Sequence, residues 1–101
     1  MKKIFFIFFL VIISSSAFAD SEIELGLEVF NKKAQCGMCH SLKAAGSKGE
    51  IGPNLDMLKP LTSQVVLAVT NGVGVMPAFE GILSVEEIKA VAHFVSTSAS
   101  Q

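Results

Sequence analysis

Apolar residues recur at helical spacing in three segments of the chain. Ile23, Leu27 and Phe30 follow one another at i, i+4 and i+7, which predicts one face of an amphipathic helix ending near Lys32 or Lys33. Ser21-Glu22-Ile23-Glu24 has the spacing of a capping box, so the helix is expected to begin there. Gly26 lies inside it. Either another element crosses the helix closely at this glycine, or the glycine is tolerated at a cost of about 1 kcal/mol relative to alanine.

Two further helices are expected in the second half of the chain. "SQVVLAVTNG" reads as a helix capped by Thr62 or Ser63 and closed by the stop signal Asn71-Gly72. Ser84-Val85-Glu86-Glu87 is a second capping box. The helix it opens has an apolar face made of Val85, Ile88, Val91, Ala92 and Val95, and the tail "STSASQ" is expected to fray.

The segments between these helices are irregular. Residues 44–60, "AAGSKGEIGPNLDMLKP", are rich in glycine and proline, with a short helical turn expected around Asn54 to Leu58. "GVGVMPAFEG" is a second irregular stretch. No repeat and no alternating strand pattern is present, so the sequence predicts a small all-α domain. Loops this long in so small a domain are unusual unless they wrap something.

The first nineteen residues have the layout of a secretory signal. Lys2 and Lys3 precede the apolar run Ile4 to Ile13, and Ala17-Phe18-Ala19 is a small-x-small cleavage site before Asp20. The alternative is an uncleaved anchor, but the run is shorter than the roughly 20 residues that a spanning helix needs. We therefore expect a signal peptide at residues 1–19, and one exported, periplasmic domain at residues 20–101 with no membrane attachment after cleavage.

Composition supports a small acidic domain that needs internal support. Residues 20–101 carry six Lys against nine Asp and Glu, a formal net charge of −3, and the chain has no Arg. Nucleic acid is an improbable ligand for such a surface because phosphates are neutralised by basic side chains. Only three of the eight Phe lie beyond the signal segment. A domain this small usually needs a disulfide, metal or cofactor to complete its core.

"AQCGMCHSLKAAG" contains the only two cysteines, Cys36 and Cys39, followed directly by His40. A disulfide between them would close a very small loop and add little stability. A thioredoxin-like redox pair belongs with a βαβ pattern that is missing here. Zinc would need a fourth ligand from His93 or an acid. In the fourth alternative the two thiols add to the vinyl groups of a haem, and His40 binds the iron.

A haem attached in this way requires a second axial ligand from a distant loop. Met38 lies inside the attachment loop, and Met57 lies in a segment with helical character. Met76 precedes Pro77 in an irregular loop, which favours an extended conformation for it. Met76 is therefore the preferred second ligand, and His93, at an outward phase of the last helix, is its remaining rival.

The order of motifs resembles the class I monohaem cytochromes c over essentially all of residues 20–101. The residues that carry the resemblance are Gly26 and Phe30, Cys36-Gly-Met-Cys39-His40, Gly52-Pro53-Asn54-Leu55, Asn71-Gly72 and Met76-Pro77-Ala78-Phe79. The resemblance implies three to four helices around one covalent haem c, with Cys36 and Cys39 as thioethers and His40 and Met76 on the iron.

Three further expectations follow from the resemblance. The carbonyl of Pro53 would accept a hydrogen bond from His40. The first and last helices would cross at Gly26, Phe30 and Phe94. The spacer "NKKAQ" between Phe30 and Cys36 is longer than in many members, so a bulge is expected there.

"IGPNLDMLKP" and "VTNGVGVMPAFEGILS" look like the small cytochrome subunit of periplasmic sulfite dehydrogenases. That resemblance implies a non-catalytic electron-transfer protein that accepts electrons from a molybdenum-containing, sulfite-oxidising subunit and passes them to a downstream cytochrome or oxidase. The alternative is a free-standing carrier between respiratory complexes and a terminal oxidase. A haem enzyme such as a peroxidase would require Met76 to leave the iron.

Overall fold

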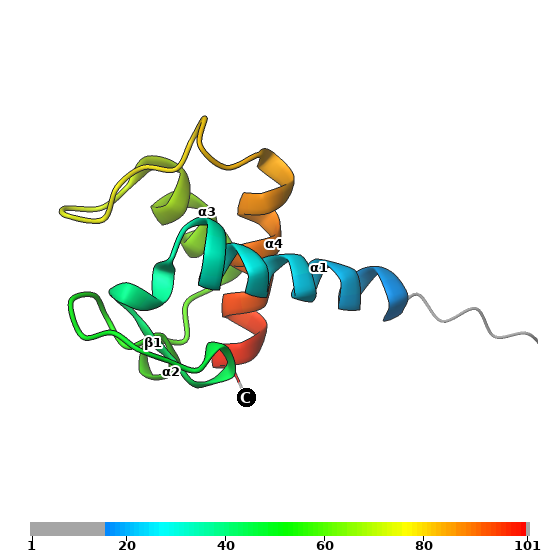
Figure 1. The fold of residues 1–101 in the computed structure, drawn as a ribbon, viewed down its shortest axis with the longest axis horizontal. Coiled ribbons are helices and arrows are strands. Elements are labelled where there is room, and N and C mark those ends of the chain that lie inside the picture. The colour runs from blue at the N-terminus through cyan, green and yellow to red at the C-terminus, as the bar shows by residue number, and fades with distance from the viewer. Residues whose placement is uncertain (1–15, 101) are drawn as a thin grey trace, which may run out of the picture.

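A computed structural model describes residues 16–100. Residues 1–15, which hold most of the expected signal segment, and residue 101 lie outside the described residues. The described part is mainly helical, as predicted (Figure 1). Its α-helices are α1 (Ser16–Glu28), α2 (Leu55–Leu58), α3 (Thr62–Asn71) and α4 (Val85–Ala99).

The first and last helices of the described chain, α1 and α4, cross each other, and Gly26 lies at the contact. A Cβ atom on Gly26 would lie 2.3 Å from the carbonyl oxygen of Ala90 and 2.5 Å from Cβ of Phe94. Only hydrogen fits in that space. One turn further along, the Phe30 and Phe94 rings meet edge to face with centroids 5.9 Å apart. The expected crossing is confirmed, and the glycine is required by packing rather than merely tolerated.

The first helix differs from the expectation at both ends. It begins at Ser16, five residues before Ser21, so the box at Ser21 does not start it. At its other end the chain continues as a π-helical turn, Val29–Lys33, in which the N–H of Ala34 donates to the carbonyl of Val29 at 2.8 Å. A π turn holds more residues than an α turn. It absorbs the length of the spacer before Cys36, where a bulge was expected.

The ends of α3 and α4 show which capping signals were interpreted correctly. The box at Ser84 is confirmed: Ser84 N–H donates to Glu87 Oε1 at 2.9 Å, and Glu87 N–H donates to Ser84 Oγ at 3.1 Å. The stop at Asn71-Gly72 is also confirmed, with Gly72 at φ 77°. The start of α3 was wrongly predicted. Leu61 is the N-cap in place of Thr62 or Ser63, because the side chain of Gln64 accepts from the N–H of Leu61 at 2.9 Å.

The expectations for the face and the end of α4 need two corrections. Val85 is 70% exposed, while the other four residues of the expected face are buried. The tail does not fray after Val95: α4 continues to Ala99, which is buried. The ammonium of Lys59 donates to the carbonyl of Ala99 at 3.0 Å, and this contact ties the last turn to the loop before α3.

The expectation that the domain contains no strand is wrong at one place. β1 (Ser41–Leu42) and β2 (Ser47–Lys48) pair antiparallel, with Ser41 opposite Lys48. The turn between them contains a 3₁₀ segment, Lys43–Ala45, and Gly46 at φ 69°. Two-residue strands leave too few positions for an alternating pattern, so the sequence carries no strand signal.

The core is concentrated around the α1–α4 crossing. Its most fully buried large side chains are Val29, Phe30, Leu42 and Val91. Among the described residues, no helix is long and apolar enough to cross a membrane. By contrast, many large apolar side chains of the remaining segments are exposed, among them Ile51, Met57, Leu58, Leu61, Leu67, Val73 and Val75. The loops, α2 and α3 thus present apolar surface that the described part of the polypeptide does not cover.

Replacing Gly26 with Ala should lower the free energy of unfolding by about 3 kcal/mol, because the new methyl group would overlap backbone atoms of α4. Chemical denaturation measures the change. Glu24→Ala, at an exposed position of the same helix, is the matched control and should change stability by less than about 0.5 kcal/mol. Equal stability of the Gly26→Ala variant and the unmodified protein would contradict the close crossing.

Candidate functional site

Cys36, Cys39 and His40 are brought together by one tight turn. Cys36–Met38 is a single 3₁₀ turn, preceded by Gln35 in the left-handed region at φ 50°. The N–H groups of Cys39 and His40 both donate to the carbonyl of Cys36, at 3.1 and 2.9 Å. Both cysteines are half-buried with unpaired thiols. The turn therefore holds the two sulfurs and the imidazole in one rigid segment.

Burial raises the pKa of the Cys36 thiol to about 11. Desolvation disfavours the thiolate, and the neighbouring Cys39 acts in the same direction. The thiol is therefore protonated at neutral pH. Thiol–disulfide exchange proceeds through the thiolate, so this environment does not favour a redox role for Cys36.

The imidazole of His40 is held in one tautomer. Its Nδ1 lies 2.7 Å from the carbonyl oxygen of Pro53. A carbonyl only accepts hydrogen bonds, so Nδ1 carries the hydrogen. In the neutral ring this leaves the lone pair on Nε2, the form in which a histidine binds a metal. The contact expected from Pro53 is present, and it prepares Nε2 as a ligand atom.

Two glycines that the sequence analysis did not assign to the site enclose this segment. A Cβ on Gly52 would lie 2.6 Å from Cε1 of His40, and a Cβ on Gly49 would lie 2.6 Å from the backbone carbon of Cys39. The N–H of Gly52 also donates to the carbonyl of Cys39 at 2.7 Å. The backbone of residues 49–52 therefore lies directly against Cys39 and His40. Gly52 was part of the quoted Gly-Pro-Asn-Leu motif, but Gly49 carries no signal that distinguishes it from other loop glycines.

Ser47 is a second residue that sequence analysis missed. Its hydroxyl donates to the carbonyl of His40 at 2.9 Å and accepts from the N–H of Leu42 at 3.1 Å. It thereby joins β2 to the residue that follows the cysteines. On the other side of Pro53, the side chain of Asn54 accepts from the N–H of Met57 at 3.2 Å and caps α2. Pro53 is thus fixed by its position directly before a capped helix.

Met76 lies in a loop with its own internal hydrogen bonds. Val73 and Met76 exchange backbone hydrogen bonds of 3.0 and 2.9 Å, and the N–H of Phe79 donates to the carbonyl of Val69 at 2.8 Å. Met76 is half-buried and packs against the core. The competing methionines are more accessible, with Met57 80% and Met38 69% exposed. In Figure 1 the loop that carries Met76 and the segment that carries the cysteines extend to the same side of α4.

His93, the rival ligand, has a different environment from the one expected. It is half-buried instead of freely solvated, and its Nδ1 lies 3.6 Å from Oε1 of Glu22. The pair connects α4 with α1. His93 thus takes part in the contact between α1 and α4, whereas Met76 lies in a separate loop.

These residues fit a covalent haem. Two thiols flank a turn, an imidazole presents Nε2, and a thioether lies in a separate loop. A haem also needs apolar walls, and the loops offer them: Val75 is 91%, Ile51 73% and Leu58 57% exposed. Leu55 and Val69, by contrast, lie in the core, and Val66 and Phe79 pack against it. Within residues 16–100, no three His, Cys, Asp or Glu side chains form the cluster that a zinc site requires.

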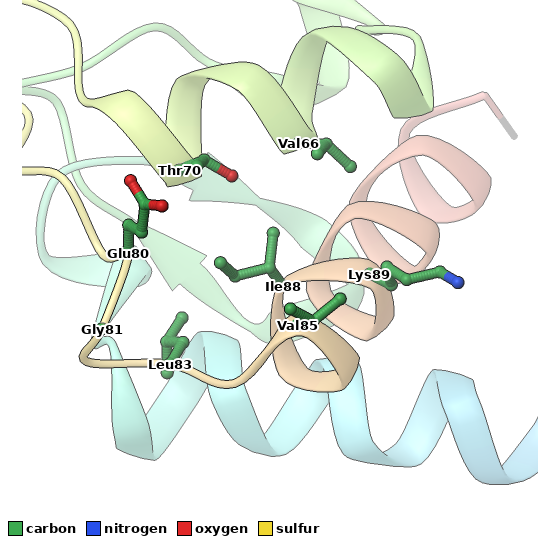
Figure 2. A pocket seen from close by; sticks show the side chains of 8 residues that line it. All are labelled: Val66, Thr70, Glu80, Gly81, Leu83, Val85, Ile88 and Lys89. Atoms are coloured by element: carbon green, nitrogen blue, oxygen red, sulfur yellow. The ribbon is translucent and has the colours of Figure 1, made fainter.

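A separate apolar groove of about 170 Å³ lies between α3 and α4 (Figure 2). Figure 2 shows Val66 and Thr70 of α3 facing Ile88 of α4 across it. Neither cysteine, His40 nor Met76 lines this groove. It is lined by Val66, Thr70, Glu80, Gly81, Leu83, Val85, Ile88 and Lys89.

Comparison with known proteins agrees with this fold. Residues 21–95 match the family described as cytochrome C oxidase, cbb3-type, subunit III. Cytochrome c6 of Picosynechococcus sp. is 33% identical over 114 residues, covering 98% of this chain and 96% of that protein. Cytochrome c6 of Leptolyngbya boryana is 36% identical over 80 residues, covering 75% of this chain and 92% of that protein. The crystal structure of the c-type cytochrome SorU from Sinorhizobium meliloti is 50% identical, with a TM-score of 0.77, and covers 81% of this chain and 95% of that one.

The chain belongs to the monohaem cytochrome c family. It is an electron-transfer protein of the c type and not an enzyme. Membership of this family, together with the cysteine pair, implies a covalent haem c.

Proposed function

We propose that the protein carries single electrons through a haem held by Cys36, Cys39, His40 and Met76. Cys36 and Cys39 would form the thioethers, and His40 and Met76 would bind the iron. The observation that carries this proposal is the hydrogen bond between Nδ1 of His40 and the carbonyl of Pro53, which leaves the lone pair of Nε2 available to bind a metal. When bound, the haem supplies an iron that gains and loses one electron.

The chain's own residues set how that iron behaves. A methionine thioether favours the reduced state and raises the potential relative to two histidines. Apolar side chains such as Val75 and Leu58 exclude water and disfavour added positive charge. Pro53 and Gly52 hold the imidazole in one orientation, so few atoms need to move when the charge changes. These features favour fast, reversible electron transfer over binding of oxygen or peroxide.

Electrons enter and leave at the surface around the cysteine turn. Gln35, Met38 and Pro77 are exposed, and Gly37 is half-buried. The net charge of −3 on residues 20–101 favours a partner with a basic docking surface. Because surface charges are screened by salt, the association rate should fall as ionic strength rises.

For the partner, we propose a molybdenum-containing, sulfite-oxidising protein. The support is the resemblance of "IGPNLDMLKP" and "VTNGVGVMPAFEGILS" to the small cytochrome subunits of sulfite dehydrogenases. The 50% identity to the c-type cytochrome SorU supports the c-type carrier on which this proposal depends. The second candidate is a free-standing carrier, which the likeness to cytochromes c6 favours.

Replacing Met76 with Ala should open the iron and lower the reduction potential by on the order of 100 mV, part of the roughly 0.8 V range that axial ligands set. Redox titration measures the potential, and carbon monoxide binding to the reduced protein measures the open site. Met57→Ala is the matched control because Met57 is 80% exposed. If Met76→Ala keeps the spectrum and potential of the unmodified protein, Met76 is not the ligand.

Export should remove residues 1–19. The mass of the protein purified from the periplasm should equal that of residues 20–101 plus one haem, and its first residue should be Asp20. Ala19→Asp, which places a charge at the small-residue position, should leave the segment attached. A full-length, membrane-associated protein in the unmodified strain would show that the segment is an anchor.

Sulfite should reduce the haem only in the presence of the partner. Stopped-flow mixing of the oxidised cytochrome with sulfite and a molybdenum-containing sulfite-oxidising protein should give fast reduction, slowed about tenfold or more between low and high salt. A parallel experiment replaces the sulfite-oxidising protein with a respiratory quinol–cytochrome reductase. Reduction in the second experiment alone would establish the free-standing carrier.

A further inference from the structure

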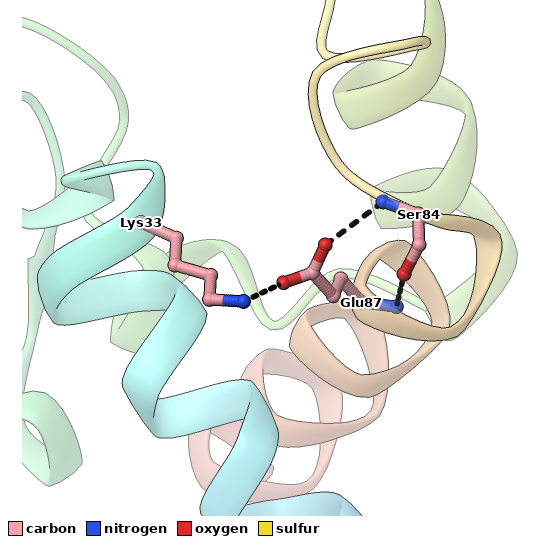
Figure 3. A network of polar contacts seen from close by, with 3 residues as sticks. All are labelled: Lys33, Ser84 and Glu87. Atoms are coloured by element: carbon pink, nitrogen blue, oxygen red, sulfur yellow. Dashed lines mark hydrogen bonds and ion pairs between the residues drawn. The ribbon is translucent and has the colours of Figure 1, made fainter.

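Outside the haem site, the carboxylate of Glu87 joins two separate polar contacts (Figure 3). Its Oε1 accepts from the N–H of Ser84 at 2.9 Å, and its Oε2 accepts from the ammonium of Lys33. The side chain of Glu87 is only 15% exposed, whereas that of Lys33 is 47% exposed. One carboxylate thus belongs both to the cap of α4 and to an ion pair with another element.

The two partners come from the segments that lead to the two axial ligands. Lys33 ends the π-helical turn and lies three residues before Cys36. Ser84 ends the loop that carries Met76 and begins α4. That loop is also held to α3, by hydrogen bonds of 2.8 Å from Gly72 N–H to the carbonyl of Ala68 and from Phe79 N–H to the carbonyl of Val69. The ion pair therefore joins the end of the Met76 loop to the cysteine segment.

A further attachment at the N-terminal end of α4 has a specific mechanical effect. The crossing at Gly26, the Phe30–Phe94 ring contact and the His93–Glu22 pair hold α1 against later turns of α4. The Lys33–Glu87 pair lies beyond these contacts, at the N-terminal end of α4, and resists separation of that end from the cysteine segment. The π turn contributes because an inserted residue rotates everything after it by about 100° around the helix axis. The residue inserted before Cys36 thereby changes the direction in which Lys33 extends.

We propose that Lys33 and Glu87 are positioning residues that hold the Met76 loop closed over the haem. The proposal rests on the proposed ligation of the iron by Met76. Opening the ion pair releases the N-terminus of α4 from the cysteine segment, and the Met76 loop moves with its anchor. The pair raises the pKa of Lys33 and lowers that of Glu87, so both groups are charged at neutral pH. The proposal therefore predicts faster loss of Met76 from the iron when the pair is broken.

The test measures how fast added imidazole displaces Met76 from the oxidised holoprotein. Imidazole enters only after the methionine leaves, so its binding rate reports opening of the loop. Lys33→Met keeps the side-chain length but removes the charge. It should raise the rate by up to about fivefold, the range that one partly exposed ion pair supports. Lys33→Arg should keep the original rate, because guanidinium also pairs with a carboxylate.

Two matched variants separate the ion pair from other effects. Lys32→Met removes a neighbouring charge that takes part in neither ion pair found among residues 16–100, and it should leave the rate unchanged. Glu87→Gln removes the ion pair but keeps an oxygen for the cap on Ser84. It should match Lys33→Met, and the double variant should be no faster than either single one. Salt of about 1 M should accelerate the unmodified protein but not Lys33→Met.

Separate outcomes distinguish this proposal from the proposed function. If the oxidised protein lacks the far-red charge-transfer band of a methionine–iron bond, the ligation proposal fails. If that band is present and is lost in Met76→Ala, ligation stands. In that case, equal imidazole rates in Lys33→Met and Lys32→Met would overturn the positioning role. Lowered unfolding stability of Lys33→Met with an unchanged imidazole rate would also overturn it, because the pair would then be only structural.

Discussion

The structure depends on the absence of a side chain at Gly26. Because α4 approaches to the point where a methyl group would meet a carbonyl oxygen at 2.3 Å, the two helices share one layer of core. Val29, Phe30, Val91 and Phe94 are buried by that approach. The cysteine turn follows the π-helical turn at the end of α1, and the loop that carries Met76 ends at the start of α4. Any widening of the crossing would therefore move both sets of ligands at once.

The site is built on a different principle from the core. Its rigidity comes from hydrogen bonds to backbone groups and from glycines that let one segment lie against another. His40 is held by Pro53 through its ring and by Ser47 through its carbonyl, while Gly52 lies against the ring. These contacts orient the imidazole by means of the polypeptide alone. Exposed apolar side chains such as Val75 also distinguish the site from the core, because they offer surface to a cofactor instead of filling the protein's own interior.

Signals carried by nearby residues predicted the fold well. The box at Ser84 and the glycine stop after Asn71 act within one turn, so the sequence shows both partners. Features that depend on distant contacts were missed or only partly foreseen. The bulge before Cys36 was expected, but the sequence does not show that it takes the form of a π turn in which Val29 and Phe30 are buried. The burial of Ala99 depends on contacts with the rest of the fold, Lys59 among them. Cys36, His40 and Pro53 could be named from their order, whereas Gly49 and the pairing of Lys33 with Glu87 require coordinates.

The helix crossing also has a consequence for the entropy of the chain. Contact between Gly26 and Ala90 closes a ring of roughly 60 residues, and every residue assigned to the haem lies inside that ring. The entropy lost on closing a ring grows only with the logarithm of its length, by about 0.6 kcal/mol for each doubling. Adding or removing a few loop residues therefore costs little, while the two helices that close the ring tolerate no change at their contact. The contact between α1 and α4 is thus fixed by packing, whereas the loops between the two helices can vary in length.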